Sequence, residues 1–450
     1  IGYNSGFDVR NAGDMNGDGY DDLIIGSPAN SGSFNGSAYF LFGSASFSAS
    51  VNMGAFNGTN GFRIYPPNAS DDGGLSVSSV GDINGDGYDD VIMGVSLGDI
   101  AGAQSGEAYV LYGKANGFLA DYNGPANGTD ATRIDGEAAG DLAGFSVSGG
   151  GDINGDGISD FIMAASGANG GAGATYVVYG TGSSLGASFD LSTLDGADGY
   201  TINGITAGDT TLGISVSIVG DVNGDGYDDF LIGASGGDEG AADAGESYLV
   251  FGTASTGASL DLSDLDGTNG ITINGITASD YSGFSVSGAG DINGDGYDDL
   301  IIGAYGADPN GAASGQSYVI YGSSSYGEVT VVGAGSQTAG ADNVIGTSGA
   351  DTLDGDAGAD VLIGGAGDDI LIYDSNDRRV DAGNGEDILR LENGDDVNFT
   401  TQTVDIRSTE IIDAATDSGA NAITMDYFNI LELSEDGNVL TIEGGTSDSF

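Results

Sequence analysis

The 450-residue chain contains no cysteine, histidine or tryptophan, and only eight of its residues are lysine or arginine. The absence of cysteine and histidine excludes disulfides, zinc sites of the usual kind, thiol nucleophiles and catalytic triads that use imidazole as their base. A net charge of -60 excludes nucleic-acid binding and disfavours an anionic membrane surface, because both need a basic face. The chemistry that remains is that of oxygen ligands.

Long hydrophobic runs are also missing. No stretch of 18 apolar residues occurs, so we expect no membrane insertion. The chain begins at Ile1 without a basic and apolar leader, which we interpret as a processed product or a fragment. Glycine is abundant at 86 residues, and the 68 acidic residues are mostly aspartate, which prefers turns. We therefore expect the negative charge to lie in loops between the elements of a folded core.

A nine-residue acidic motif recurs five times, and its spacing sets the architecture. The copies begin at Asp14, Asp82, Asp152, Asp221 and Asp291, at intervals of 68, 70, 69 and 70 residues. Short apolar runs around each copy predict strands, in the fourth unit at residues 200–205, 214–219, 230–234 and 247–251. Helical periodicity is not sustained, so the sheets must pack on one another. Four-stranded blades arranged radially achieve this.

Three further motifs accompany the acidic loop. They are a Gly and apolar pair that opens a strand (residues 144–147 and 283–286), Ile-Gly-Ala-Ser (232–235) and Gly-Glu-Ser-Tyr-Leu-Val-Phe-Gly (245–252). In this order they resemble the FG-GAP repeat of integrin α-subunit propellers. The resemblance implies an all-β fold with calcium under the propeller loops and, by looser analogy, a role in adhesion. We predict five blades over residues 1–333, closed by a strand at 328–333. The alternative is part of a seven-bladed ring, as in integrins.

From residue 346 the period changes to nine. Gly at the fourth place, Asp at the sixth and Leu at the eighth recur in four of the five units 346–354, 355–363, 364–372, 373–381 and 382–390. This pattern resembles the RTX nonapeptide, which implies a parallel β-roll with calcium between its turns. We predict a β-roll over residues 334–398 and a small β-rich segment over 399–450.

The five acidic loops match the needs of calcium, which takes six to eight oxygen ligands. Side chains at loop positions 1, 3, 5 and 9 and the carbonyl at position 7 supply such oxygens, and glycine permits the tight turn. Position 12 is apolar in every copy, which excludes an EF-hand. A metal-free turn that caps itself with side-chain hydrogen bonds is the alternative. The predicted propeller ligands are Asp14, Asn16, Asp18, Tyr20 and Asp22; Asp82, Asn84, Asp86, Tyr88 and Asp90; Asp152, Asn154, Asp156, Ile158 and Asp160; Asp221, Asn223, Asp225, Tyr227 and Asp229; and Asp291, Asn293, Asp295, Tyr297 and Asp299.

The roll is predicted to hold further calcium ions. By the RTX resemblance, successive nonapeptides alternate between two sheets, so turns two repeats apart share a cation. One edge carries Asp351, Asp369 and Asp387, while the other carries Asp360 and Asp396 with Arg378 between them. We predict an intact calcium row on the first edge and an interrupted one on the second. The alternative is a roll that ends by residue 373.

The function expected from these features is non-catalytic. We expect a calcium-dependent secreted or cell-surface adhesion or structural protein that binds a glycan or protein ligand or assembles with itself. About five calcium ions in the propeller and more in the roll would drive folding outside the cell, where calcium is abundant. The RTX resemblance implies type I secretion to the bacterial surface or beyond. Loops 99–106, 238–245 and 308–315 differ between blades and are the expected contact sites.

The alternative function is a secreted polysaccharide-degrading enzyme, a glycosidase or lyase on a propeller scaffold. Two Gly-x-Ser-x-Gly matches, at residues 182–186 and 233–237, lack the histidine that a hydrolase triad needs. A carboxylate pair remains open in principle, because the chain has 68 acidic residues. Most of the clustered acids are nevertheless assigned to metal loops, so we predict no catalytic residue.

Overall fold

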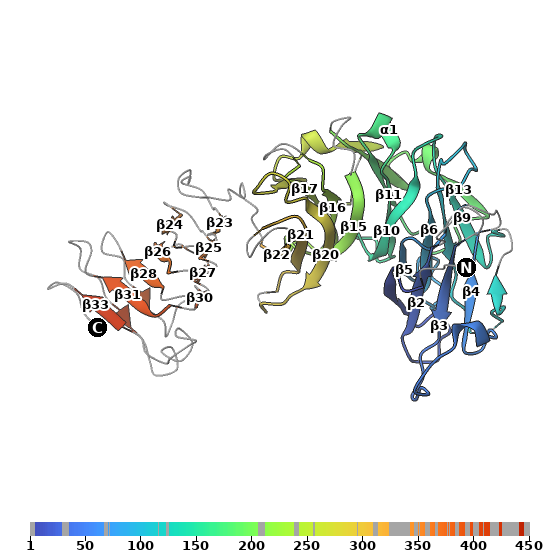
Figure 1. Ribbon diagram of the computed structural model, residues 1–450, viewed down its shortest axis with the longest axis horizontal. Coiled ribbons are helices and arrows are strands. Elements are labelled where there is room, and N and C mark those ends of the chain that lie inside the picture. Colours follow the sequence, from blue (N-terminus) through green and yellow to red (C-terminus); the bar gives the residue numbers. More distant parts are fainter. Residues whose placement is uncertain are drawn as a thin grey trace. The chain divides into compact units, whose positions relative to one another are not determined.

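A computed structural model of the chain divides into two compact units, residues Ile1–Ser324 and Ser325–Phe450 (Figure 1). In the first unit it describes residues 5–28, 36–66, 71, 73–115, 117–122, 126–205, 212–237, 243–254, 257–294, 296–308 and 314–323. In the second it describes 343–345, 350, 352–355, 361–364, 368–375, 377, 379–382, 387–391, 397–398, 405–407, 409–414, 423–424 and 441–444. Each unit is considered by itself below.

The first unit is a five-bladed β-propeller, as predicted, and the strands named below are antiparallel within each blade. Blade 1 contains β1 (Val9–Gly13), β2 (Asp22–Ser27), β3 (Ser37–Leu41) and β4 (Gly61–Ile64). Blade 2 contains β5 (Val77–Gly81), β6 (Asp90–Val95), β7 (Glu107–Leu111) and β9 (Ala131–Asp135). Blade 3 contains β10 (Ala143–Gly151), β11 (Asp160–Ala165), β12 (Ala174–Val178) and β14 (Gly199–Asn203). Blade 4 contains β15 (Leu212–Gly220), β16 (Asp229–Ala234), β17 (Glu246–Val250) and β19 (Gly270–Asn274), and blade 5 contains β20 (Ser282–Gly290), β21 (Asp299–Ala304) and β22 (Gln316–Ile320).

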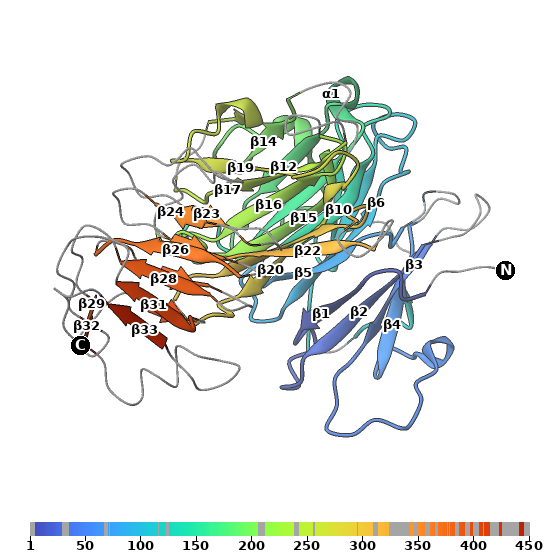
Figure 2. The same ribbon diagram turned by 60° about the vertical axis from the view of Figure 1, so that its left-hand side comes forward.

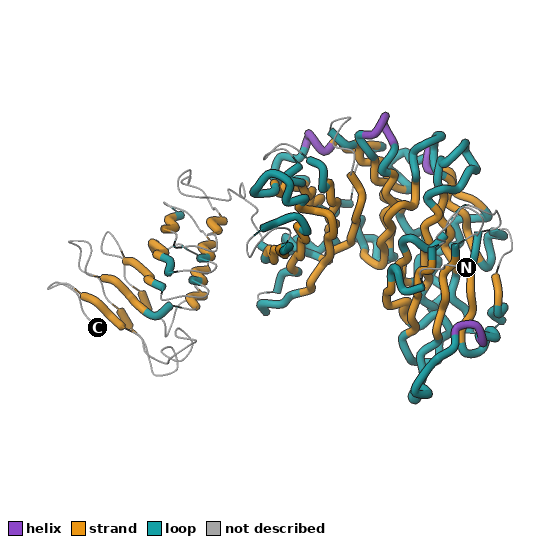
Figure 3. Tube along the Cα trace, in the orientation of Figure 1, coloured by secondary structure: helices purple, strands orange, loops and turns teal. Residues whose placement is uncertain are grey.

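Helical structure is almost absent from the described residues (Figure 3). It consists of one short turn, α1 (Ala168–Gly171), and three 3-10 turns at Met53–Ala55, Leu191–Thr193 and Leu262–Asp264. None of the described helices has the length and apolarity needed to cross a membrane.

The blades are out of phase with the sequence units. Residues 200–205, placed in the fourth unit by sequence, correspond to β14, which pairs with β12 and is the outer strand of blade 3. The outer strand of each of blades 1 to 4 therefore precedes the Gly and apolar pair of the next unit. Blade 1 is consequently complete, and it is blade 5 that has three described strands. The closing strand predicted at 328–333 lies outside the described residues.

The hydrophobic core lies between the blades rather than within them. The first strands β1, β5, β10, β15 and β20 pack on one another in this order. Figure 1 labels β5, β10, β15 and β20 of this row. In β11, Phe161 and Ile162 point to opposite faces and both are fully buried. The central strands of the inner blades are covered on both sides, which explains why they read as continuous apolar runs.

Short additional strands link neighbouring blades. β8 (Asp121–Tyr122), β13 (Ser188–Asp190) and β18 (Ser259–Asp261) pair in parallel with the outer strands β4, β9 and β14. Each of them follows the third strand of one blade but joins the sheet of the preceding blade. The outer edges of blades 1, 2 and 3 are thereby paired.

The second unit is a parallel roll in which successive short strands alternate between two sheets (Figure 2). One sheet has the order β23 (Asn343–Ile345), β25 (Val361–Ile363), β27 (Arg379–Asp381) and β30 (Asp405–Arg407). The other has the order β24 (Thr352–Asp354), β26 (Ile370–Tyr373), β28 (Ile388–Leu391), β31 (Ile411–Ala414) and β33 (Thr441–Gly444). A separate pair joins β29 (Val397–Asn398) to β32 (Ile423–Thr424).

The nonapeptide period accounts for the register of this roll. Leu353 pairs with Leu371 and Leu371 with Leu389, so partners lie two repeats apart, and all three side chains are buried. The alternative of a roll that ends by residue 373 is wrong, because β28 continues the sheet. Beyond β28 the spacing loosens, since Ile388 pairs with Ile411.

Candidate metal centres

Each acidic loop joins the first and second strands of a blade and is shaped by its own side chains. In the first loop the amide of Asp18 donates to Asp14 Oδ1 at 3.0 Å and to Asn16 Oδ1 at 2.9 Å. The amide of Gly19 donates to Asp14 Oδ2 at 2.8 Å, and that of Tyr20 to Asp18 Oδ1 at 3.0 Å. The second, third and fourth loops repeat this pattern.

Two glycines in every loop are required by the backbone. In the first loop Gly17 and Gly19 have φ values of +71° and +88°, in the left-handed region that other residues avoid. Their counterparts in the other four loops also have positive φ. The first four loops thus share one arrangement, in which the side chains at positions 1 and 3 both accept the amide of position 5.

The aspartate at position 9 begins the second strand and is buried in all five blades. These residues are Asp22, Asp90, Asp160, Asp229 and Asp299, and each is 0% exposed. In blade 2, Asp90 Oδ1 accepts the amide of Gly113 at 2.7 Å, while its buried Oδ2 has no hydrogen-bond partner. In the other four blades Oδ2 of this aspartate accepts the amide of loop position 2. A buried carboxylate oxygen without a donor is costly unless a cation meets it.

The pKa values of these carboxyl groups reflect the same cost of burying a negative charge. Burial raises the pKa of Asp22 to about 6, of Asp160 to about 7 and of Asp90 and Asp229 to about 8. The carboxylates at positions 1 and 5 of the same loop raise it further, while backbone amide donors oppose the shift. Three negative charges therefore lie close enough to disfavour one another, a situation that a divalent cation reverses.

The donor set fits a hard cation, but the carboxylates are not drawn together. Among the residues that the structure describes, no three acidic side chains converge closely enough to hold an ion. Positions 1 and 5 are instead turned toward the amides of their own loop. Such hydrogen bonds also suit the alternative of a metal-free turn, and the position-9 aspartates Asp22, Asp160, Asp229 and Asp299 likewise accept backbone amides through both carboxylate oxygens. The oxygen donors of the loops and the unpartnered Asp90 oxygen are of the kind that calcium takes as ligands, but ligation by these residues stays a prediction.

The tyrosine side chain at position 7 packs on the neighbouring loop, and the use of its carbonyl as a ligand stays a prediction. Tyr88 of the second loop lies against Gly17 of the first, since a Cβ on Gly17 would stand 2.5 Å from its ring. Ile158 replaces tyrosine at this place without changing the hydrogen bonds of its loop. Asp295 of the fifth loop lies outside the described residues, and the remaining predicted ligands of that loop are described.

In the roll, one edge gathers acidic side chains in a row. Asp369 and Asp387 are fully buried, and the amide of Asp369 donates to Asp387 Oδ1 at 2.7 Å. The amide of Asp387 donates in turn to Glu410 Oε2 at 3.0 Å. Burial, Asp369 and Glu410 together raise the pKa of Asp387 to about 6. These contacts place two of the three residues predicted for this edge side by side.

The other ligands predicted for the roll are not tested. Asp351, Asp360, Arg378 and Asp396 lie outside the described residues, so the interrupted second row stays a prediction.

Glu410 was missed by the sequence analysis. It lies beyond the last nonapeptide, 23 residues after Asp387 rather than 18. The available signal was local, because Glu410 precedes Ile411 and Ile412 as Asp387 precedes Ile388 and Leu389.

A second buried carboxylate, outside the loops, was also missed. Glu107 in β7 is fully buried and accepts the hydroxyl of Tyr109 at 3.1 Å through Oε1. Burial raises its pKa to about 7, with Asp71 adding to the shift while the Tyr109 hydrogen bond and Arg133 oppose it. This group lies in blade 2, among residues that no predicted metal site includes.

Comparison with protein families identifies two kinds of repeat, one in each part of the chain. Five stretches match the FG-GAP repeat, at residues 11–41, 73–111, 143–178, 212–250 and 282–320. Each match covers the first three strands of one blade together with its acidic loop. Residues 337–371 match the RTX calcium-binding nonapeptide repeat.

Curated relatives are integrin α subunits. Integrin alpha-PS5 of Drosophila melanogaster is 31% identical over 160 residues, which cover 35% of this chain and 14% of the relative. Integrin alpha-6 of Gallus gallus is 29% identical over 162 residues, covering 35% and 13%. Integrin alpha-5 of Xenopus laevis is 30% identical over 246 residues, covering 52% and 20%. The chain thus matches only a small part of the length of these relatives. The predicted resemblance is confirmed: the chain carries five tandem FG-GAP repeats, is similar to integrin α subunits over part of its length, and has an RTX calcium-binding nonapeptide repeat after the fifth FG-GAP repeat.

Proposed function

We propose that the chain is a secreted, non-catalytic adhesion or structural module whose fold is completed by calcium in the five propeller loops and in the roll. The observation that carries the proposal is the buried aspartate at position 9, which occurs in all five blades and, in the first four, lies beside two further carboxylates. Without a cation this arrangement costs folding free energy, and with one it contributes to it. Calcium then acts as the condition for a folded binding surface.

The free energy of calcium binding is large enough for calcium to control folding. A site that binds only the folded state adds about 2.7 kcal/mol when calcium exceeds its Kd a hundredfold. Five such sites would add roughly 13 kcal/mol as an upper bound, comparable to the whole stability of an ordinary domain. Cytosolic calcium is too low to fill weak sites, whereas extracellular calcium is not. We therefore propose an extracellular or bacterial cell-surface location, reached by type I secretion.

The test is thermal unfolding of the Asp90→Asn variant, in excess calcium and in EGTA. Removing a buried charge should leave the melting temperature in EGTA unchanged or higher. Losing a ligand should lower it in calcium, so that the calcium-induced rise shrinks by about 5 °C. Asp266→Asn is the matched control, because Asp266 is exposed and lies in a turn outside the acidic loops.

Two results would contradict the proposal. One is a melting temperature of the unmodified chain that EGTA does not change. The other is an Asp90→Asn variant that loses the same stability in both buffers, since this would assign Asp90 a purely structural role.

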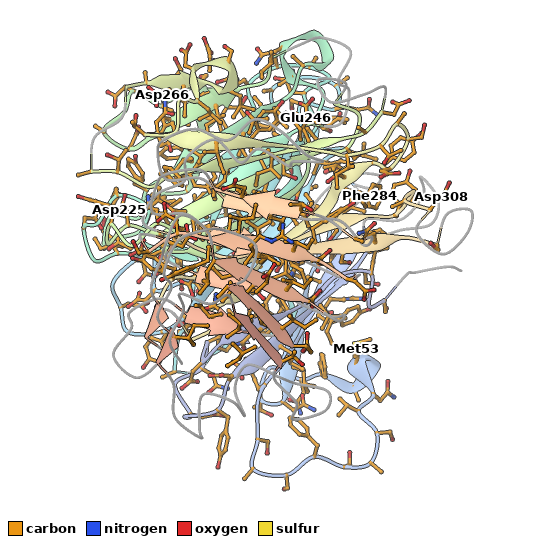
Figure 4. All side chains as sticks on the ribbon, turned by 90° about the vertical axis from the view of Figure 1, so that its left-hand side faces the viewer. Met53, Asp225, Glu246, Asp266, Phe284 and Asp308 are labelled. Carbon is orange, nitrogen blue, oxygen red and sulfur yellow. The ribbon has the colours of Figure 1, made fainter. Side chains whose placement is uncertain are left out.

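The partner is proposed to bind at the end of the propeller opposite the calcium loops. The connection between the second and third strands of a hairpin lies at the other end from the connection between the first and second. Figure 4 accordingly shows Asp225 of the fourth acidic loop and Asp308 of a second-to-third connection at opposite ends of the blades. A glycan or a protein ligand is the proposed occupant, bound with calcium and released by EGTA.

A glycan and cell-binding assay of the calcium-loaded chain tests this part. Binding that survives unchanged in EGTA would contradict it. Turnover of a bound polysaccharide would instead favour a glycosidase or lyase, a function that no feature of the described residues supports.

A further inference from the structure

Blade 1 has a face that no other described blade covers. Val9 and Leu23 are 51% and 41% exposed. Their counterparts in blades 2 to 5 are at most 4% exposed: Val77, Val147, Val216 and Val286 for the first, and Val91, Phe161, Phe230 and Leu300 for the second. These positions form the leading face, the face that each later blade packs against the blade before it.

Blade 5 has the complementary face open. Ile301 and Val319 are 38% and 42% exposed. Their counterparts in the four earlier blades are all 0% exposed: Ile24, Ile92, Ile162 and Leu231 for the first, and Phe40, Val110, Val177 and Leu249 for the second. These positions form the trailing face, the face that each earlier blade offers to the blade after it.

Hydrogen bonds repeat at the four existing junctions. The amide of a valine in the first strand donates to a side chain of the preceding blade. The pairs are Val77 to Asp8 Oδ2 at 2.9 Å, and Val147 to Ser76 Oγ, Val216 to Ser146 Oγ and Val286 to Ser215 Oγ, each at 3.1 Å. Ser285 occupies the acceptor's place on blade 5, and the amide of Val9 occupies the donor's place on blade 1.

The acidic loops make a second repeated contact. At three of the four junctions an aspartate at loop position 8 accepts the position-1 amide of the preceding loop, whereas the third loop has Ser159 at this position. The pairs are Asp14 to Asp89 Oδ2 at 2.7 Å, Asp152 to Asp228 Oδ2 at 2.8 Å and Asp221 to Asp298 Oδ2 at 3.1 Å. In blade 1 the acceptor position is occupied by Asp21, which is exposed. In blade 5 the donor position is occupied by Asp291.

A tyrosine on a glycine completes the junction. A Cβ on Gly155 or Gly224 would stand 2.5 or 2.4 Å from the ring of Tyr227 or Tyr297 of the next blade. The equivalent Gly294 of blade 5 has open space at this place, and Tyr20 of blade 1 is 46% exposed. The open faces of blades 1 and 5 therefore carry the apolar side chains, hydrogen-bonding groups and tyrosine–glycine pair that a fifth junction would use.

We propose that the trailing face of blade 5 binds the leading face of blade 1 of a second copy of this chain, head to tail. The four junctions within the chain show what covers such a face, namely another blade of the same repeat. Among the described strands of one chain no comparable packing joins β20 to β1. The proposal does not rest on the proposed adhesive function.

Such an interface is heterologous, so each copy keeps one open face of each kind. Association continues until the copies close a ring, or it grows as a filament. The net charge of -60 per chain opposes it, whereas calcium in the loop that contains Tyr20 and Asp21 favours it. Association should therefore require calcium and strengthen with salt.

Sedimentation velocity of the full chain in excess calcium tests the proposal with two variants. Val9→Asp blocks the leading face and Val319→Asp blocks the trailing face. Each variant alone should sediment as a monomer at concentrations at which the unmodified chain associates. An equimolar mixture should form a complex of twice the monomer mass and nothing larger, because each variant retains the one face that the other has lost.

Leu119→Asp is the matched control. Leu119 is 63% exposed but belongs to neither face, so this variant should associate as the unmodified chain does. Circular dichroism and melting in calcium establish that all three variants are folded.

Two outcomes would overturn the proposal. The first is an unmodified chain that stays monomeric at every concentration up to about 100 µM, which means that the two faces close within one chain or are covered by its own second unit. The second is folded variants whose mixture shows no dimer, which means that the faces do not bind each other.

Discussion

At the residue scale, the surroundings of an acidic side chain decide what it contributes. Burial raises the pKa of Asp90 to about 8, with Asp86 and Asp82 adding to the shift. Asp266 is also an aspartate in a turn, yet hydrogen bonds from Thr268 lower its pKa. Under the proposed function the first residue gains from a cation, whereas the second accepts hydrogen bonds from its own turn. A count of acidic residues does not separate the two.

Glu107 allows a prediction about pH, because its environment contains no predicted metal ligand. Its pKa is raised from 4.5 to about 7, so the folded state holds the proton more tightly than the unfolded state does. Stability from this group is complete below about pH 4.5 and is lost as the pH rises to about 7. Glu107→Gln keeps an acceptor for Tyr109 and removes the charge. It should raise the free energy of unfolding by about 3 kcal/mol at pH 8 and by much less at pH 5.

Denaturant unfolding of the calcium-loaded chain at the two pH values measures this effect. The exposed Asp195→Asn is the control and should change little at either pH. Equal stabilisation by Glu107→Gln at pH 5 and pH 8 would show that burial of the charge is not the cause.

At the element scale, spacing predicted most of the fold and of the candidate sites. The interval of about 70 residues predicted the five blades, and the nine-residue interval predicted that Asp369 and Asp387 lie side by side. The position of the outer strand was not predictable in this way, because β14 pairs across a unit boundary that a periodic sequence does not mark. Glu410 was not predicted for a related reason. The chain between β28 and β31 is longer than two nonapeptides, so a strict nine-residue period does not align Glu410 with Asp387.

Glu410 provides a prediction for the roll. Its Oε2 accepts the amide of Asp387, and glutamine keeps that acceptor while losing the charge. Glu410→Gln should therefore weaken the tightest calcium binding of the roll at least about tenfold, since calcium affinity depends on the number of charged ligands. Asp354→Asn is the control, because Asp354 ends β24 outside the row.

Calorimetric titration of the full chain with calcium measures this change. The heats assigned to the propeller loops should be the same in both variants and in the unmodified chain. Unchanged affinity in Glu410→Gln would remove Glu410 from the calcium row.

At the scale of the whole molecule, charge and repetition act against each other. The net charge of -60 tends to expand the chain, while the inter-blade cores hold the propeller together. Composition alone predicted the first effect. The second needed the structure, because only the burial of equivalent residues in successive blades shows which faces are covered and which are open.

Ionic strength separates the two effects. In EGTA, raising NaCl from about 0.05 to 0.5 M should increase the melting temperature, because the Debye length falls and the repulsion is screened. In excess calcium the increase should be smaller, since bound cations already neutralise the loops. Choline chloride serves as the control for specific sodium binding and should act as NaCl does. The same increase with and without calcium would mean that the loop charges are not the source of the repulsion.

The parallel strands β8, β13 and β18 bear on how the propeller comes apart. Each follows the third strand of one blade in sequence and is hydrogen-bonded to the outer strand of the preceding blade. Unfolding of one blade therefore also removes the strand that pairs with the outer edge of its neighbour. Because these strands connect neighbouring blades, an inner blade should not unfold independently of the blades beside it. Mechanical pulling should therefore release several repeats in a single event rather than one at a time.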